Sequence, residues 1–235
     1  MVWHGLRSAS KPLLPSHQLS QTLDPVVVLK TIAVCSEDTI RTRRTKDVSM
    51  RKVVALELGS LDGVMEKPEE WSFSYSNDEM AEANAAGMAG SDAMLLGRVT
   101  YEEFAAFWPY QDRTEQPFTD YLDNTSKYVV STTLQEPLEW QNSMLIKGNV
   151  AEEIAKLKRQ PGKDITILGS GTLVRSLLEA DLLDELSLMV HPVVLGRGKH
   201  LFEEGSDQKT LELVDSKTFS IGVLYLTYRP ARNDQ

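Results

Sequence analysis

A glycine, an arginine and a threonine lie close together just after an apolar run. Gly97 permits a tight turn directly after the apolar residues 93–96. Arg98 offers a planar fork of donors that suits a phosphate group. Thr100 could cap a following helix or donate to an anion at its positive end. The alternative is a plain helix cap followed by a surface arginine.

A second group of hydroxyl side chains follows the apolar pair Val129 and Val130. Ser131 and Thr132 stand directly after this run, where hydroxyls can bind phosphate. Hydroxyl residues in such places also form ordinary serine and threonine turns. Both interpretations stay open for this segment.

Residues 169–172 read Gly-Ser-Gly-Thr and lie between an expected strand and an expected helix. The two glycines would let a pyrophosphate approach the backbone, and such a turn can direct amide hydrogens at an anion. The segment is not a Rossmann fingerprint, because Val174 stands where the third glycine or alanine should be and because it comes late in the chain. A tight turn with a helix cap is the alternative.

A carboxylate stands beside a glycine after the first expected strand. Asp62 and Gly63 follow the β-rich run at 52–58. A carboxylate near the edge of a sheet could orient a substrate or supply a proton to it. An Asp-Gly pair is also a common turn, which is the alternative interpretation.

These segments need a fold that brings the ends of their strands together. We expect strands at 52–58, 93–96, 127–131, 143–147, 164–168 and 186–190, and helices at 78–88, 99–107, 152–159 and 172–180. Residues 211–219 and 223–229 alternate apolar and polar side chains like an antiparallel hairpin. The order predicts an α/β fold with an open, mixed and mostly parallel sheet, flanked by helices and ending in a C-terminal antiparallel hairpin.

In open α/β sheets, ligands bind outside the carboxyl ends of the strands. Three loops after apolar strands, each able to hold phosphate oxygens, therefore predict an elongated ligand with several phosphates. A dinucleotide with a 2′-phosphate fits this description.

Composition narrows the classes of function. The net charge is −9, and an acidic chain argues against a broad nucleic-acid surface, which needs clustered lysine and arginine. No stretch approaches the roughly 20 apolar residues of a membrane helix. The single cysteine, Cys35, excludes an internal disulfide and a multi-cysteine zinc cage, and it fits a cytoplasmic location. The scattered histidines predict no metal site.

Residues 1–49 lack sustained periodicity and contain serine, threonine, glutamine and proline throughout. We expect a disordered leader or a non-native extension upstream of a start at Met50, with a transit peptide as the alternative. The catalytic domain is expected to span residues 50–235.

The order of these motifs is similar to that of dihydrofolate-reductase-like proteins. The motifs are Ser-Leu-Asp-Gly at 60–63, Leu-Gly-Arg-Val-Thr-Tyr-Glu at 96–102, Val-Ser at 130–131, Gly-Ser-Gly-Thr-Leu at 169–173 and His-Pro-Val-Val-Leu-Gly-Arg-Gly at 191–198. The resemblance covers residues 51–230 and is closest to the reductase domain of riboflavin biosynthesis, the C-terminal half of the bifunctional deaminase–reductase. The chain resembles a stand-alone form of that domain.

The resemblance implies NADPH as the hydride donor and assigns roles to individual residues. For the coenzyme it implies Arg98 and Ser131 at the 2′-phosphate end, Thr100, Gly169, Ser170, Gly171 and Thr172 near the pyrophosphate, Ala55 beside the nicotinamide, and Gly97 and Thr132 as further contacts. Near the substrate it implies Asp62, as the candidate catalytic residue, together with Ser60, Gly63, Leu195 and Gly196.

The implied activity is the NADPH-dependent reduction of a C=N or C=O bond in a small molecule, heterocycles included, as in 5-amino-6-(5-phosphoribosylamino)uracil reductase. The alternatives are an NADP-binding module without catalysis and a pteridine or dihydrofolate reductase. Folate is disfavoured, because the first long helix has no carboxylate in a matching context. No zinc deaminase half is expected, because its signature needs more than one cysteine. By analogy, a homodimer would form through the C-terminal hairpin.

Overall fold

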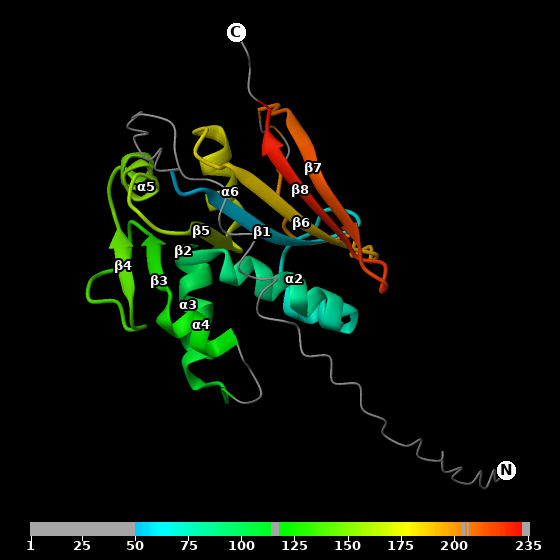
Figure 1. The fold of residues 1–235 in the computed structure, drawn as a ribbon, viewed down its shortest axis with the longest axis horizontal. Coiled ribbons are helices and arrows are strands. Elements are labelled where there is room, and N and C mark those ends of the chain that lie inside the picture. The colour runs from blue at the N-terminus through cyan, green and yellow to red at the C-terminus, as the bar shows by residue number, and fades with distance from the viewer. Residues whose placement is uncertain (1–49, 114–117, 204, 206, 232–235) are drawn as a thin grey trace, which may run out of the picture. The chain divides into compact units, whose positions relative to one another are not determined.

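The computed structural model describes residues 50–113, 118–203, 205 and 207–231. The expectation for residues 1–49 lies outside this range. Within it, eight strands form one sheet in the order β4-β3-β2-β5-β1-β6-β8-β7 (Figure 1). The strands are β1 (Val53–Ser60), β2 (Ser91–Gly97), β3 (Ser126–Val130), β4 (Ser143–Ile146), β5 (Asp164–Leu168), β6 (Glu185–His191), β7 (Leu211–Thr218) and β8 (Leu224–Pro230).

Strands β1 to β6 are parallel to one another. β1 pairs with β5 and β6, β2 with β3 and β5, and β3 with β4, all in parallel register. β8 is antiparallel to β6, and β7 is antiparallel to β8. The expected mostly parallel sheet with a C-terminal antiparallel hairpin is therefore confirmed.

Helices cover both faces of the sheet, because parallel neighbours need crossover connections. One face carries α2 (Asp78–Ala89), α3 (Arg98–Phe107) and α4 (Phe118–Asn124), and the other carries α5 (Val150–Lys158) and α6 (Gly171–Glu179) (Figure 1). One apolar cluster packs α5 and α6 onto β1, β2 and β5, and another packs α3 and α4 onto β2 and β3. The central strands are thus buried on both sides. In the described part of the chain, no helix is long and apolar enough to cross a membrane.

Every expected strand and helix is present, and no end is displaced by more than two residues. The apolar runs predict the inner strands because helices bury these strands. The edge strand β7 is mostly exposed and was predicted from its alternating pattern instead. Helix α4 and the short 3-10 helices η1 (Pro68–Glu70), η2 (Phe73–Tyr75) and η3 (Trp108–Tyr110) were not predicted.

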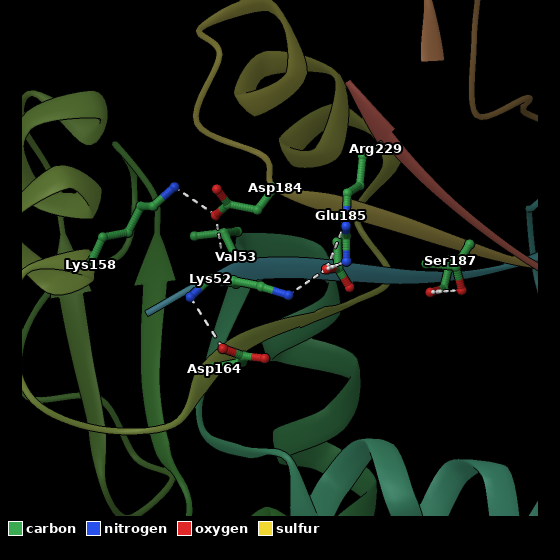
Figure 2. Close-up of polar contacts among 9 residues, drawn as sticks. Lys52, Val53, Lys158, Asp164, Asp184, Glu185, Ser187 and Arg229 are labelled. Atoms are coloured by element: carbon green, nitrogen blue, oxygen red, sulfur yellow. Dashed lines mark hydrogen bonds and ion pairs between the residues drawn. The ribbon is translucent and has the colours of Figure 1, made fainter. Parts of the chain in front are cut away.

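Charged side chains join strands at the amino end of the sheet, opposite to the loops that follow the strands. Glu185 accepts hydrogen bonds from Lys52 Nζ at 2.6 Å and from Arg229 Nη2 at 2.9 Å (Figure 2). The Oδ2 atom of Asp184 accepts one from the backbone N–H of Val53 at 2.7 Å. These contacts tie β1, β6 and β8 together, so they fix where the carboxyl ends of β1 and β6 emerge.

Lys127 of β3 is fully buried although it carries an ammonium group. Its Nζ donates to the carbonyl oxygens of Leu122 at 2.6 Å and Thr125 at 2.9 Å, at the C-terminal end of α4. It also lies 4.3 Å from the ring centre of Trp140. Burial lowers the pKa of this ammonium to about 8. The cation satisfies carbonyls that a helix end leaves unpaired, and so it attaches α4 to the sheet.

Candidate functional site

The loops after β2, β3 and β5 begin side by side at one edge of the sheet. Gly97 at the end of β2 pairs with Val130 at the end of β3, and Leu95 of β2 pairs with Ile167 of β5. Because these strands are parallel and adjacent, their carboxyl ends reach the same edge. We call residues 97–100, 131–132 and 169–172 the rim.

Two parts of the rim touch each other. A Cβ atom added to Gly97 would lie 2.3 Å from Oγ of Ser170. A Cβ atom added to Gly169 would lie 3.5 Å from Cγ2 of Thr100. Gly169 and Ser170 both have positive φ, 73° and 74°, and Ser170 is the residue for which this conformation is unusual. The loops after β2 and β5 therefore form one surface, and Gly97 leaves the room that brings them together.

Two helices begin at the rim without a side-chain cap. α3 follows Gly97 and α6 follows Ser170, and neither N-cap residue makes a side-chain hydrogen bond. In contrast, Asn77 and Asn149 cap α2 and α5 by accepting a backbone hydrogen bond. Uncapped first-turn amides at the positive end of a helix attract anions. The rim thus has two neighbouring sets of such amides.

Arg98 lies in the first turn of α3 with an exposed side chain. Its Nη1 donates to Oε2 of Glu102 at 2.6 Å, and each side chain is 45% exposed. An exposed pair at this helical spacing contributes little to stability. Arg98 is therefore able to leave Glu102 for a bound phosphate.

Ser131 is buried at the end of β3, and its hydroxyl is already used locally. Its Oγ accepts hydrogen bonds from the backbone N–H groups of Thr133 and Leu134, both at 3.1 Å. This is the ordinary turn that was the alternative for this segment. Thr132 is exposed beside it. The structure thus places both residues on the rim, with Thr132 the more accessible hydroxyl.

Asp62 joins the loop after β1 to the loop after β6. Its Oδ1 accepts from Ser60 Oγ at 2.6 Å and from Leu195 N at 3.1 Å. Its Oδ2 accepts from Gly196 N at 2.7 Å. The residues expected near the substrate, Gly63 included, therefore lie together in these two loops.

The same hydrogen bonds determine the charge of Asp62. Bonds from the Ser60 hydroxyl and from the amides of Gly196 and Leu195 lower the pKa of this carboxyl to about 2. A group with so low a pKa is ionised near neutral pH and is a poor proton donor. The geometry favours a positioning role for Asp62 over proton transfer.

Ala55 does not reach the rim. It is fully buried within β1, where it pairs with Ile167 of β5 and Leu186 of β6. β1 continues to Ser60 before the chain enters the loops of the site. Its place beside the nicotinamide stays a prediction.

A cavity of about 170 Å³ lies at the carboxyl ends of β1 and β6, and it contains a carboxyl group that the motifs did not indicate. Glu57 lines it, is 2% exposed, and its Oε1 has no hydrogen-bond partner among the described residues. Burial raises the pKa of Glu57 to about 8. The sequence did contain one indication that Glu57 is buried. Alternate residues of a strand share a face, and Glu57 follows Val53 and Ala55 on the buried face of β1.

His191 is a second buried polar side chain near these loops. Its Nδ1 lies 3.2 Å from the carbonyl oxygen of Gly59 and 3.0 Å from that of Met189. Trp71 and Tyr75 pack edge-on against the ring, at centroid distances of 5.2 Å and 5.7 Å. Burial lowers the pKa of His191 below its ordinary value. The ring therefore holds the aromatic loop before α2 against β6.

Residues 51–225 match the family model of the RibD C-terminal domain. The chain belongs to this family. Two uncharacterized proteins from Bacillus subtilis are similar to the chain in sequence. YyaP is 32% identical and matches 78% of this chain and 97% of its own length. YwjB is 31% identical and matches 75% of this chain and 90% of its own length.

Solved structures show that the RibD C-terminal fold is the one seen here. A protein assigned to riboflavin biosynthesis from Shewanella sp. PV-4 aligns with a TM-score of 0.62 and 24% identity, over 77% of this chain and 99% of its own. The Thermotoga maritima diaminohydroxyphosphoribosylaminopyrimidine deaminase/5-amino-6-(5-phosphoribosylamino)uracil reductase aligns with a TM-score of 0.55 and 15% identity, over 77% of this chain and 57% of its own. The likeness to a dihydrofolate-reductase-like RibD domain is therefore confirmed, and this chain covers a little over half of the Thermotoga protein.

Proposed function

We propose that this RibD C-terminal domain is an NADPH-dependent reductase that transfers a hydride to a C=N or C=O bond of a small heterocyclic substrate. The observation that carries the proposal is the contact between the loops after β2 and β5, where two uncapped helix N-termini and Arg98 meet. A ligand held there needs negative charge at more than one point along its length. NADPH has a pyrophosphate and a 2′-phosphate.

The rim fits that coenzyme. The space at Gly97 and the positive φ of Gly169 let a phosphate approach the backbone amides of α3 and α6 closely. We assign the pyrophosphate to Thr100 and to residues 169–172. We assign the 2′-phosphate to Arg98, with Ser131 and Thr132 beside it. When bound, the coenzyme would supply the hydride.

The protein's own contribution is orientation and exclusion of water. Ionised Asp62 holds the loops after β1 and β6 together, so it fixes the wall against which a substrate would lie. We therefore propose Asp62 as a positioning residue, and Ser60, Gly63, Leu195 and Gly196 as the adjacent substrate contacts.

We propose the substrate class from the family. The Thermotoga maritima neighbour is described as a deaminase and uracil-derivative reductase, which supports a pyrimidine of the riboflavin pathway as a first substrate to test. We propose residues 50–235 as the catalytic unit. We also propose a homodimer in which the exposed apolar side chains of the hairpin, Leu213, Val214 and Leu224, meet a second copy.

NADPH turnover tests the proposal. The full chain should bind NADPH, seen as a change in coenzyme fluorescence, and should oxidise it in the presence of the riboflavin-pathway aminopyrimidine. Binding without oxidation across this compound, aldehydes and dihydropteridines would identify a non-catalytic NADP-binding module. A chain that binds neither NADPH nor NADP⁺ would refute the assignment of the rim.

A further inference from the structure

The loops after β1 and β6 are joined at two places. Asp62 of the first loop accepts hydrogen bonds from the second, and Val64 forms an antiparallel bridge with His200. We call residues 60–66 and 195–203 of these loops the wall. Because the wall would face the substrate and the rim would hold the coenzyme, a side chain that contacts both would link the two halves of the proposed site.

Arg175 of α6 makes these contacts. Its Nη1 donates to the carbonyl oxygen of Leu201 in the wall at 2.8 Å. Its Nη2 donates to Oγ1 of Thr172, a residue of the rim, at 3.3 Å. The same Nη2 donates to Oε1 of Glu203, also in the wall, at 2.7 Å. The guanidinium group can make these bonds at the same time because it carries five N–H donors in one fixed plane.

The surroundings of Arg175 favour a directional role over a general attraction of anions. Its side chain is 17% exposed, and the carboxylate of Glu203 balances its charge. Arg98, in contrast, is 45% exposed and is able to turn toward a ligand. The position of Arg175 is therefore set by the protein, between the wall and its own helix.

The contact with Arg175 determines what the Thr172 hydroxyl can do. A hydroxyl has one proton to donate and two lone pairs that accept. Arg175 has no acceptor, so Thr172 can only accept from it and keeps its own proton available. Thr172 is exposed in the first turn of α6, where that proton can be donated to a phosphate oxygen.

We propose that Arg175 is a positioning residue that couples coenzyme binding at the rim to the position of the wall. It presents the Thr172 hydroxyl to the pyrophosphate, and with the same planar group it holds the carbonyl oxygen of Leu201. Coenzyme bound at Thr172 would favour the position of the wall that a substrate needs, and by linkage the substrate would favour coenzyme binding. The inference rests on the proposed function, because the rim must bind NADPH for this link to act.

An amide NMR titration of the full chain with NADP⁺ tests the link. The Leu201 carbonyl and the Phe202 N–H belong to one peptide unit, so the Phe202 amide signal reports on the bond from Arg175. In the native chain this signal should shift together with those of residues 169–172 and give the same Kd. In Arg175→Met the signals of residues 169–172 should still shift, and the Phe202 signal should not. Arg159→Met, at the exposed end of α5, is the control and should behave as the native chain.

A double-mutant cycle separates positioning from a purely structural role. Thr172→Val removes the hydroxyl and Arg175→Met removes the group that orients it, so each should raise the Kd of NADP⁺ by roughly threefold to tenfold. Because Arg175 would act through Thr172, the double variant should bind about as weakly as the weaker single variant. Arg175→Lys keeps the charge but not the planar fork, so it should also lose the Phe202 shift, and it replaces Arg175→Met in the test if that variant does not fold.

A Phe202 signal that shifts with the rim in the Arg175 variants would overturn the proposal. So would losses of affinity that add up in the double variant, or an Arg175 variant that binds NADP⁺ as tightly as the native chain. In each of these cases the native chain still binds NADP⁺, so the proposed reductase function is unaffected. A native chain that binds no NADP⁺ would overturn the proposed function and this inference with it.

Discussion

Asp62 and Arg98, the two charged residues that the sequence motifs single out, have different surroundings in the structure. Asp62 is held by three donors from two loops, which keep it ionised. Arg98 is exposed and has a single exposed partner, Glu102. At the scale of single residues, Asp62 is therefore a fixed part of the wall, whereas Arg98 is available to a ligand.

Arg98→Ala should weaken NADPH binding far more than NADH binding. Hydrogen bonds to a charged group contribute about 1.5–3 kcal/mol, which is roughly tenfold to a hundredfold in Kd. Fluorescence titration with both coenzymes measures the difference. Glu102→Gln is the control, since it frees Arg98 and should leave NADPH binding equal or tighter. Equal losses for the two coenzymes would remove Arg98 from the 2′-phosphate site.

Asp62→Asn should lower turnover and largely preserve coenzyme affinity, because it weakens the joint between the two loops. The carboxyl has a lowered pKa in the folded chain, so its stabilisation is fully present above the ordinary pKa of an aspartate and is lost as the pH falls toward 2. Calorimetry should therefore find a difference in melting temperature between native chain and variant that shrinks from pH 5 to pH 3. A difference in melting temperature that stays constant with pH would show that the contact between the two loops does not depend on the charge of Asp62.

Some residues of the candidate site could be predicted from the sequence, and others could not. The glycines and Arg98 could be found because each directly follows an apolar strand. The partners of Asp62 could not, because Leu195 and Gly196 lie more than 130 residues away in the chain. Glu57 could have been found from the two-residue period of β1, but a glutamate within a strand matches no motif.

At the scale of elements, the apolar pattern of the sequence predicted the strands and the longer helices. Helix α4 is the exception. α4 has only seven residues, four of them polar, so it has little periodicity to detect. Its place depends on Lys127 of β3, a tertiary contact that no local pattern contains.

Lys127→Met should destabilise the fold. The substitution keeps the length of the side chain but leaves carbonyls at the end of α4 unpaired, at a cost of roughly 1–3 kcal/mol. Chemical denaturation measures the change in the free energy of unfolding. Lys147→Met, on an exposed side chain, is the control and should change it little. Equal stability of the Lys127 variant and the native chain would show that α4 is held by apolar packing alone.

Gly97→Ala should impair the rim without unfolding the sheet. The added Cβ would lie 2.3 Å from Oγ and 3.0 Å from Cβ of Ser170, so the Ser170 side chain must shift at the turn before α6. We expect NADPH affinity to fall by about tenfold or more, the equivalent of about 1.4 kcal/mol. Gly148→Ala, where nothing lies within 4 Å, is the control. Unchanged affinity in the Gly97 variant would mean that the two turns do not act together.

At the scale of the whole domain, the parallel sheet explains why segments far apart in the chain form one site. Six parallel strands place the loops after β1, β2, β3, β5 and β6 at one edge. The ion pairs of Glu185 at the opposite end of the sheet join β1, β6 and β8, and the loops after β1 and β6 belong to the site (Figure 2). The shared rim could be predicted because strand direction alone determines it.

An amide NMR titration of the full chain with NADP⁺ tests the central claim most directly. If the turns after β2 and β5 bind the same coenzyme molecule, the amide signals of residues 97–100 and 169–172 should shift together and give a single Kd. NAD⁺, which lacks the 2′-phosphate, should shift residues 169–172 at higher concentration and move Arg98 least. Shifts confined to one of the two turns, or centred elsewhere in the described domain, would contradict the account.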